Sequence, residues 1–192
     1  MTVPNGEQAA EVLATIPELE LIEDAELRSK VVAAWIRAWE MCGVERLDQA
    51  IKLAKPVDDP SIGVLHVRSV IRLTTEAART LRDVYGVEIN VDYVAAGAAL
   101  HDVCKPVEYT AKHPGTPRGD YVHHAITGAA IALEVGLPIE IVHIVAYHSH
   151  FGDSVDRSLE GHLVHALDDL SFDAMIRKHS GLSMRQFIAA HH

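Results

Sequence analysis

One short segment constrains this chain more than any other. The alanine-rich stretch AALHDVCKPVEY, at positions 98–109, carries His101 and Asp102 side by side among apolar residues and then meets Lys105-Pro106. Adjacent residues on a helix point about 100° apart, so a core helix rarely turns both toward its buried side. Either the pair lies at a solvated edge, or a ligand located between the two directions binds both side chains.

The composition indicates a folded, globular chain. Its 192 residues, 48% of them hydrophobic, are enough for one sizeable core, and we predict a single domain over residues 1–192. No apolar run approaches the length of about 20 residues that a membrane span needs, and the start lacks the pattern of a secretion signal. Cys42 and Cys104 are too few for a disulfide framework, so we expect a cytoplasmic location.

The charge and the histidine content bear on function. Lys and Arg number 17 against 27 Asp and Glu, which gives a formal net charge of -10. This balance argues against a general nucleic-acid-binding surface. The 13 histidines are the unusual feature of the composition, and they direct attention to metal or acid–base chemistry.

Hydrophobic periodicity predicts an all-α fold, a helical bundle in one domain. No alternating strand pattern stands out, and Trp35 and Trp39 are expected in the core. The predicted helices cover residues 18–41, 44–54, 62–85, 91–105, 121–135, 138–150, 155–170, 171–180 and 183–190.

Glycine and proline set the expected helix ends. Gly43 and Gly86 should each stop a helix, and Pro106 should close the helix that precedes it. The polar stretch at 107–120 is expected to be a loop. In the helix at 62–85, Leu65 and Leu73 are expected on the apolar side, together with Val70, Ala77 and Leu81.

Histidine and aspartate residues recur near the ends of these helices or in alanine-rich stretches, where an unpartnered polar group is costly. Neutral imidazole and carboxylate are the ligands that suit manganese, iron, zinc or magnesium. If several helices each bring one such group to a shared point, a metal ion could lie between neighbouring side chains of the His-Asp pair. The residues concerned are His66, His101, Asp102, His123, His124, His148, His150, Asp168 and Asp169.

The order His66, then His101-Asp102, then Asp168 resembles the HD-domain superfamily of metal-dependent phosphohydrolases. LHDVCKPVEY is similar to the His-Asp stretch of that family, and HHAITGAAIALEVGLPIEIVHIVAYHS is similar to the segment that supplies two further histidines in its binuclear members. The resemblance implies three parts of one domain: N-terminal helices at 18–55, the metal-binding core at 62–175, and a C-terminal helix and tail at 176–192.

The resemblance also implies a ligand set. Two divalent metal ions are expected per chain, with manganese, iron, magnesium, cobalt, nickel and zinc all open as their identity. Asp102 would bridge both ions. The first ion would be held by His66, His101, Asp102 and Asp168, and the second by His124 and His148 together with Asp102.

Three ligand choices stay open at this stage. His124 is preferred to His123 because the family pattern then places a small residue at Gly128. Asp168 is preferred to its neighbour Asp169 for its place in VHALDDLSFDA. His150 cannot share a helix face with His148 at a spacing of two, so it lies outside the site or is the ligand in place of His148.

Further side chains have two interpretations each. Lys105 either offsets the dipole of a helix C-terminus or contacts an anionic oxygen of the substrate. Arg118, in the polar loop, is the candidate for a phosphate contact, although a solvated surface position is the alternative. His165 lies three residues before Asp168 and could be the partner of a ligand. Cys104 stands where the family often has glycine, and we expect a small buried cysteine.

The implied activity is hydrolysis of a phosphoester in a small phosphorylated compound or nucleotide, by a metal-activated water. Asp102, Lys105 and Asp168 would be the catalytic residues. Two alternatives share the scaffold: a di-iron oxygenase, and a non-catalytic sensor of a metal or nucleotide. A homo-oligomer is possible, because the N-terminal helix could cap the core or pack against a partner subunit.

Overall fold

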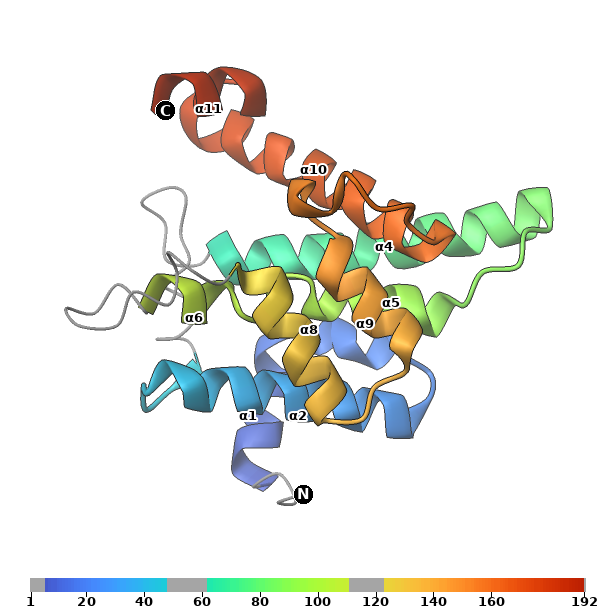
Figure 1. Cartoon of the computed structure of the whole chain (residues 1–192), viewed down its shortest axis with the longest axis vertical. Helices are drawn as coiled ribbons and strands as arrows, with labels where there is room; N and C mark the ends of the chain where they lie inside the picture. The colour runs from blue at the N-terminus through green and yellow to red at the C-terminus, as the bar shows by residue number, and fades with distance from the viewer. Residues whose placement is uncertain (1–5, 48–61, 111–122, 192) are drawn as a thin grey trace.

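The computed structural model describes residues 6–47, 62–110 and 123–191, and all regular structure in these ranges is helical. The all-α prediction is therefore confirmed. Figure 1 shows how the helices are arranged; helices of the 3-10 type are called η. The elements are α1 (Gly6–Thr15), η1 (Pro17–Leu21), α2 (Ala25–Cys42), α4 (Ile62–Tyr85), α5 (Val91–Leu100), α6 (Lys105–Thr110), α8 (His124–Glu134), α9 (Ile139–Tyr147), η2 (His150–Gly152), α10 (Leu159–Ser180) and α11 (Met184–His191).

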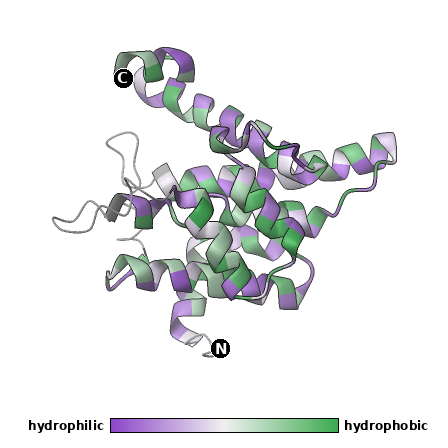
Figure 2. Cartoon of the chain, in the orientation of Figure 1, coloured by the Kyte–Doolittle hydropathy of each residue, from purple (hydrophilic) through white to green (hydrophobic). Residues whose placement is uncertain are grey.

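Helix α5 is the centre of the fold. Every residue from Val94 to Leu100 is buried, and α5 packs against α2, α4, α9 and α10. A helix that is apolar all round needs neighbours on every side. Figure 2 shows the matching pattern, with apolar residues concentrated in the central helices and polar residues frequent in α10. Because His101 follows Leu100 directly, the packing that fixes α5 also fixes the start of the His-Asp pair.

Two contacts fix the C-terminal half of α5. A Cβ atom added to Gly97 would lie 2.5 Å from Cγ2 of Ile144, so α5 and α9 touch at this glycine. On another side, Nε1 of Trp35 in α2 donates a hydrogen bond of 3.0 Å to the carbonyl of Ala99, one of the carbonyls that a helix end leaves unpaired. Trp35 and Trp39 are both buried, as expected.

The predicted helix at 18–41 is wrong in one respect, because it is broken into η1 and α2. Asp24 is the N-cap of α2, and its carboxylate accepts hydrogen bonds from the backbone N–H groups of Glu26 and Leu27 at 2.8 and 3.0 Å. The backbone N–H of Asp24 itself donates to Asp92 at 2.8 Å. A capping carboxylate starts a new helix, and periodicity alone does not show this break.

The predicted helix at 91–105 is also wrong, because it consists of two helices. Helix α5 ends at Leu100, residues 101–104 form a hydrogen-bonded turn, and α6 begins at Lys105. Pro106 therefore lies in the first turn of α6 instead of closing a helix. Proline is tolerated there because the first N–H groups of a helix have no intrahelical partner.

Two further predictions, for the helix at 62–85 and for the loop at 107–120, are confirmed only in part. The helix at 62–85 is confirmed as α4, but Leu65 and Leu73 are 46% and 41% exposed. The buried side of α4 instead includes a row of residues at a spacing of four: His66, Val70, Thr74 and Ala78.

The first residues of the predicted loop at 107–120 are the end of α6, and the remainder of that loop lies outside the described residues.

The C-terminal part contains one long helix where two were predicted. Helix α10 runs unbroken through the expected join between 155–170 and 171–180, and it begins only at Leu159. Helix α9 ends at Tyr147, before the predicted 150. Helix α1 was not predicted, and the predicted helix at 44–54 lies mostly outside the described residues.

The described helices α1, α2, α4, α5, α8, α9 and α10 contribute to one hydrophobic core. No helix in the described ranges combines the length and the apolar character that a membrane crossing needs. The single domain over residues 1–192 stays a prediction, since part of the chain lies outside those ranges.

We predict that Gly97→Ala lowers the free energy of unfolding by about 1–3 kcal/mol, because the added methyl group overpacks the contact with Ile144. Denaturant unfolding followed by circular dichroism measures the change. Gly161→Ala is the matched control, since a Cβ there meets its nearest atoms at ordinary distances of 3.5 Å or more. Equal stability of the two variants would contradict the proposed close contact of α5 and α9.

Candidate metal centre

Six polar side chains converge beyond the C-terminal end of α5. Helix α4 supplies one, the turn after α5 supplies two, the first residue of α8 and the residue that follows α9 supply one each, and α10 supplies the last. Five of the six are buried and the sixth is partly buried, which is unusual for polar groups unless they are paired or bind a ligand. They are the six residues that the sequence predicts as metal ligands: His66, His101, Asp102, His124, His148 and Asp168.

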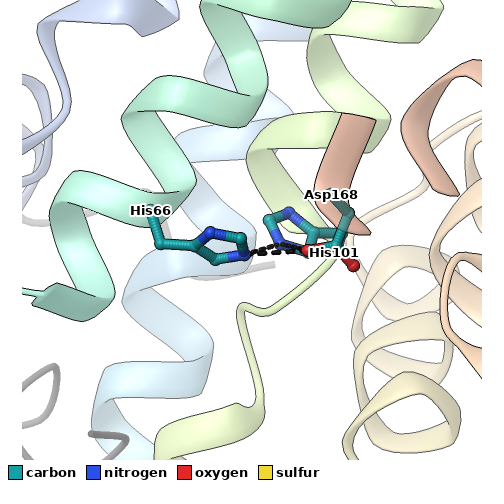
Figure 3. Close-up of side chains that lie close together, drawn as sticks. All are labelled: His66, His101 and Asp168. Carbon is teal, nitrogen blue, oxygen red and sulfur yellow. Dashed lines mark hydrogen bonds and ion pairs between the residues drawn. The ribbon is translucent and has the colours of Figure 1, made fainter. Parts of the chain in front are cut away.

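The first ligand group consists of His66, His101 and Asp168 (Figure 3). Nε2 of His66 lies 2.8 Å from Oδ1 of Asp168 and 3.3 Å from Nε2 of His101. Nε2 of His101 lies 3.7 Å from the same oxygen of Asp168. Two ligand atoms around a tetrahedral zinc ion lie about 3.3 Å apart, so this spacing suits a divalent ion.

The second ligand group consists of Asp102, His124 and His148. Oδ1 of Asp102 lies 3.2 Å from Nε2 of His124 and 3.7 Å from Nε2 of His148. The two imidazole nitrogens are 3.4 Å apart. This group has the same dimensions and the same donor types as the first.

The carboxylate of Asp102 lies between the two groups. Its Oδ2 atom is 3.6 Å from Nε2 of His101 and 4.0 Å from Nε2 of His66, while Oδ1 faces the second group. Oδ1 is buried and accepts no hydrogen bond from the part of the chain that the structure describes. Burying a carboxylate oxygen without a hydrogen bond costs free energy, and a cation among Asp102, His124 and His148 would offset that cost. The residues present therefore fit a pair of divalent metal ions.

The turn at residues 101–104 explains why a histidine and an aspartate occur side by side. Because α5 has ended, both side chains are free to point into the space between the helices, and both are buried. His101 belongs to the first group, and Asp102 faces both. Of the two possibilities that the sequence leaves open for the pair, a solvated edge is excluded by this burial.

The ligand histidines are oriented by bonds at their second nitrogen. Nδ1 of His101 lies 2.7 Å from the carbonyl of Ala98, and Nδ1 of His148 lies 2.8 Å from the carbonyl of Val145. A carbonyl only accepts, so each Nδ1 carries the proton and donates. In the neutral ring this leaves the lone pair of Nε2 directed into the centre, as a metal ligand requires.

The other two ligand histidines are held by side chains that the sequence did not indicate. Nδ1 of His124 lies 2.6 Å from the carboxylate of Glu108, which also accepts the backbone N–H of His124 at 2.8 Å. Nδ1 of His66 lies 3.2 Å from the hydroxyl of Ser171. Ser171 follows Asp168 by three residues on α10, a spacing that puts both on one helix face and could have identified it. No spacing rule links Glu108 to His124.

Electrostatics favour the metal-binding forms of three central residues, His101, Asp102 and Asp168. Complete burial lowers the pKa of His101 to about 4, against the opposing influence of Asp102 and Asp168. Burial disfavours ionisation of Asp102, but the Lys105 ammonium and His101 outweigh it and hold its pKa well below the usual value. The pKa of Asp168 is also lowered, since His101 and His66 outweigh its burial. Neutral imidazole and ionised carboxylate are the states that bind metal.

The structure places the two members of each alternative ligand pair differently. His148 lies in the centre, whereas the side chain of His150 is 64% exposed. Asp168 contacts His66, whereas Asp169 lies 3.5 Å from Nε2 of His150.

His123 lies next to the centre but has a capping role. It is the N-cap of α8, where its Nδ1 accepts the backbone N–H of Ala125 at 3.3 Å. Its ring stacks on Phe151 with the ring centroids 5.1 Å apart.

Four further expectations concern residues around the centre. Nζ of Lys105 lies 2.8 Å from Oδ2 of Asp102, so its ammonium contacts the central carboxylate. Nδ1 of His165 donates to the carbonyl of His148 at 2.6 Å, and His165 is thus a partner of a ligand residue through the backbone. Cys104 is buried as expected, and burial raises the pKa of its thiol to about 12. Arg118 lies outside the described residues.

The fold and this centre define an all-α protein with clustered His and Asp ligands that could bind metal ions. Residues 64–173 match the model of the HD domain family, which is more than half of the chain. The chain belongs to the HD domain family, and the resemblance inferred from the His-Asp motif is confirmed.

Comparison with characterised proteins gives three relatives. The chain is 39% identical over 110 residues to the dihydroneopterin 2',3'-cyclic phosphate phosphodiesterase of Methanocaldococcus jannaschii, a match that covers 54% of this chain and 43% of that protein. It is 33% and 34% identical over 82 residues to the ribonucleases Y of Roseiflexus sp. and Chloroflexus aurantiacus. Those matches cover 43% of this chain and 13% and 14% of the two ribonucleases.

The chain therefore spans less than half the length of each relative that it matches. No solved structure gives a significant match.

We predict that Glu108→Gln weakens metal binding at the Asp102–His124–His148 group by about 10–100-fold, because the amide is a poorer acceptor for the imidazole N–H of His124. Titration of the metal-free protein with Mn²⁺ measures this affinity. Glu88→Gln, at an exposed position, is the control and should bind as the wild type does. An unchanged affinity in Glu108→Gln would show that this carboxylate has no part in orienting the ligand.

Proposed function

We propose that this chain is a metal-dependent hydrolase that cleaves a phosphoester bond in a small phosphorylated compound, using two metal ions bridged by Asp102. One observation carries the proposal: the two carboxylate oxygens of Asp102 face two different ligand groups. Membership of the HD domain family supports it. So do the names of the relatives, which are a phosphodiesterase and two ribonucleases.

The two groups divide the ligands between the ions. His66, His101 and Asp168 would hold the first ion together with Oδ2 of Asp102. The second ion would be held by Oδ1 of Asp102 with the remaining two ligand histidines, His124 and His148. When bound, two such cations polarise the phosphoryl oxygens and lower the pKa of a water molecule between them.

The protein's own side chains hold the Asp102 carboxylate in position and stabilise the charge that grows on the substrate. Lys105 fixes the Asp102 carboxylate from one side, while the turn at 101–104 fixes its backbone, so the separation of the two groups is set by rigid parts of the fold. The Lys105 side chain is 30% exposed, which lets its ammonium also contact a phosphoryl oxygen that gains charge during the reaction. Asp168, 17% exposed, is the carboxylate suited to orient the attacking water.

A small substrate fits the surroundings better than a polynucleotide. Asp102 and Lys105 line a narrow pocket together with Trp35, Val64 and Val67, so access to the centre on this side is confined. The net charge of -10 disfavours a polyanionic chain. The 39% identity to an enzyme named for a cyclic phosphate points in the same direction.

Two earlier expectations stay part of the proposal. Arg118 remains our candidate for an added phosphate contact. Cys42 and Cys104 are both thiols, which agrees with a reducing, cytoplasmic location.

The proposal is tested by hydrolysis assays with a panel of small phosphodiesters, including dihydroneopterin 2',3'-cyclic phosphate and the 2',3'-cyclic nucleotides. We expect metal-dependent formation of the phosphomonoester at the same rate with and without oxygen. A requirement for oxygen, with oxygen consumed, would instead indicate a di-iron oxygenase. Metal-dependent binding of these compounds without turnover would indicate a sensor.

We predict that Asp102→Ala abolishes hydrolysis and releases both metal ions together, because both ligand groups lose an oxygen. Elemental analysis and the phosphodiesterase assay, run on the same preparation, measure the two effects. Asp83→Ala removes an exposed carboxylate on α4 and should keep both properties. Two retained ions per chain in a folded Asp102→Ala protein would exclude the bridging role.

Lys105→Ala should lower kcat/KM by about 10²–10³-fold, because the charge that grows on the phosphoryl oxygens loses its ammonium partner. Lys105→Arg keeps the charge and should recover part of this loss. Steady-state kinetics, with metal content measured in parallel, separates the substrate role of Lys105 from its contact with Asp102. Full activity of Lys105→Ala would show that Lys105 contacts Asp102 but has no role in stabilising the substrate.

A further inference from the structure

A second cluster of histidine and aspartate lies beside the proposed centre, where η2 and the turn after it face α10. It contains His150, Asp153 and His165, whose candidate ligand atoms all lie within 4.8 Å of one another. None of these residues belongs to the two ligand groups of the centre, and the proposed hydrolysis does not use them.

The spacing of the cluster suits a small divalent ion. Nδ1 of His150 lies 3.2 Å from Oδ2 of Asp153, and Nε2 of His165 lies 3.9 Å from Oδ1 of Asp153. The two imidazole rings are perpendicular, with centroids 5.4 Å apart. Ligand atoms around a tetrahedral zinc ion are about 3.3 Å apart, so small rotations of these side chains complete a site. Asp169 lies 3.5 Å from Nε2 of His150, on the side of the ring away from Asp153, and is not one of the three ligands.

His165 is already oriented as metal-ligating histidines are. Its Nδ1 donates to the carbonyl of His148 at 2.6 Å, so in the neutral ring the lone pair of Nε2 is free and faces Asp153. In the proposed centre, His101 and His148 are oriented in the same way, with Nδ1 donating to a backbone carbonyl. The His165 side chain is only 16% exposed, which is low for an imidazole that serves solvation alone.

The charges around the cluster have a negative balance. Two carboxylates, Asp153 and Asp169, lie next to the ring of His150, and the guanidinium of Arg157 pairs with Asp153. Arg157 donates to Oδ1 of Asp153 at 2.8 Å and to the carbonyls of Tyr147 and Ser149 at 2.6 and 2.9 Å. The guanidinium therefore fixes Asp153 through Oδ1, while Oδ2 faces Nδ1 of His150, and an ion bound here would lie between these two atoms.

We propose that His150, Asp153 and His165 form a separate binding site for a transition-metal ion, with Zn²⁺ as the ion that we expect to bind. Two imidazoles with one or two carboxylates are a donor set that zinc accepts. The ion would join η2 to α10. His148 lies two residues before His150, and His165 lies three residues before Asp168, so this ion would link two segments that carry ligands of the proposed centre.

The first test is the zinc content at one fixed concentration of free Zn²⁺. The wild type should bind one zinc ion more per chain than His150→Ala, and Asp153→Asn should bind that ion at least about tenfold more weakly. His162→Ala removes an exposed histidine of α10 and should bind as the wild type does. Equal zinc content in the wild type, His150→Ala and Asp153→Asn would overturn the proposal.

Hydrogen exchange gives an independent readout on the same proteins. Zinc should slow the exchange of backbone amides at 149–157 in the wild type and in His162→Ala, but not in His150→Ala. The same exchange with zinc in the wild type and in His150→Ala would contradict the inferred link between η2 and α10. Both experiments compare variants that share an unchanged centre, so their outcome is separate from whether the chain hydrolyses phosphoesters.

Discussion

The structure depends on one buried charge, the carboxylate of Asp102. The carboxylate is 8% exposed, and burying an uncompensated charge costs several kcal/mol even after relaxation. Lys105 compensates one oxygen at 2.8 Å, while the other oxygen faces two histidines without a hydrogen bond among the described residues. The histidines, their orienting partners and the acidic residue on α10 are all arranged around this carboxylate. Such an arrangement stabilises the fold only weakly without a cation, and it is well suited to holding one on each side.

The apolar core determines where this charge can lie. Helix α5 is buried and apolar from Val94 to Leu100, so the His-Asp pair follows its last residue. The contact at Gly97 brings α9 close enough for His148 to reach Asp102. The turn at 101–104 then directs two adjacent side chains inward, which a continued helix rarely does.

Much of this could be predicted from the sequence, and the failures have physical causes. Long periodic segments identified α4 to the residue, and the resemblance to the HD-domain superfamily pointed to the six residues that the structure brings together. The break at Asp24 and the turn after Leu100 were missed, because capping and tertiary contacts override a continuous apolar pattern. Glu108 was missed because its contact with His124 depends on how two helices are placed, which no local pattern encodes.

The decisive experiment is a crystal structure of the metal-loaded protein, with anomalous scattering recorded at the absorption edge of the bound metal. If Asp102 bridges two metal ions, two peaks lie about 3.5–4 Å apart. One should lie among His66, His101 and Asp168, the other between His124 and His148, with one oxygen of Asp102 directed at each. A single peak, or two peaks of which one does not contact Asp102, would contradict the bridged centre.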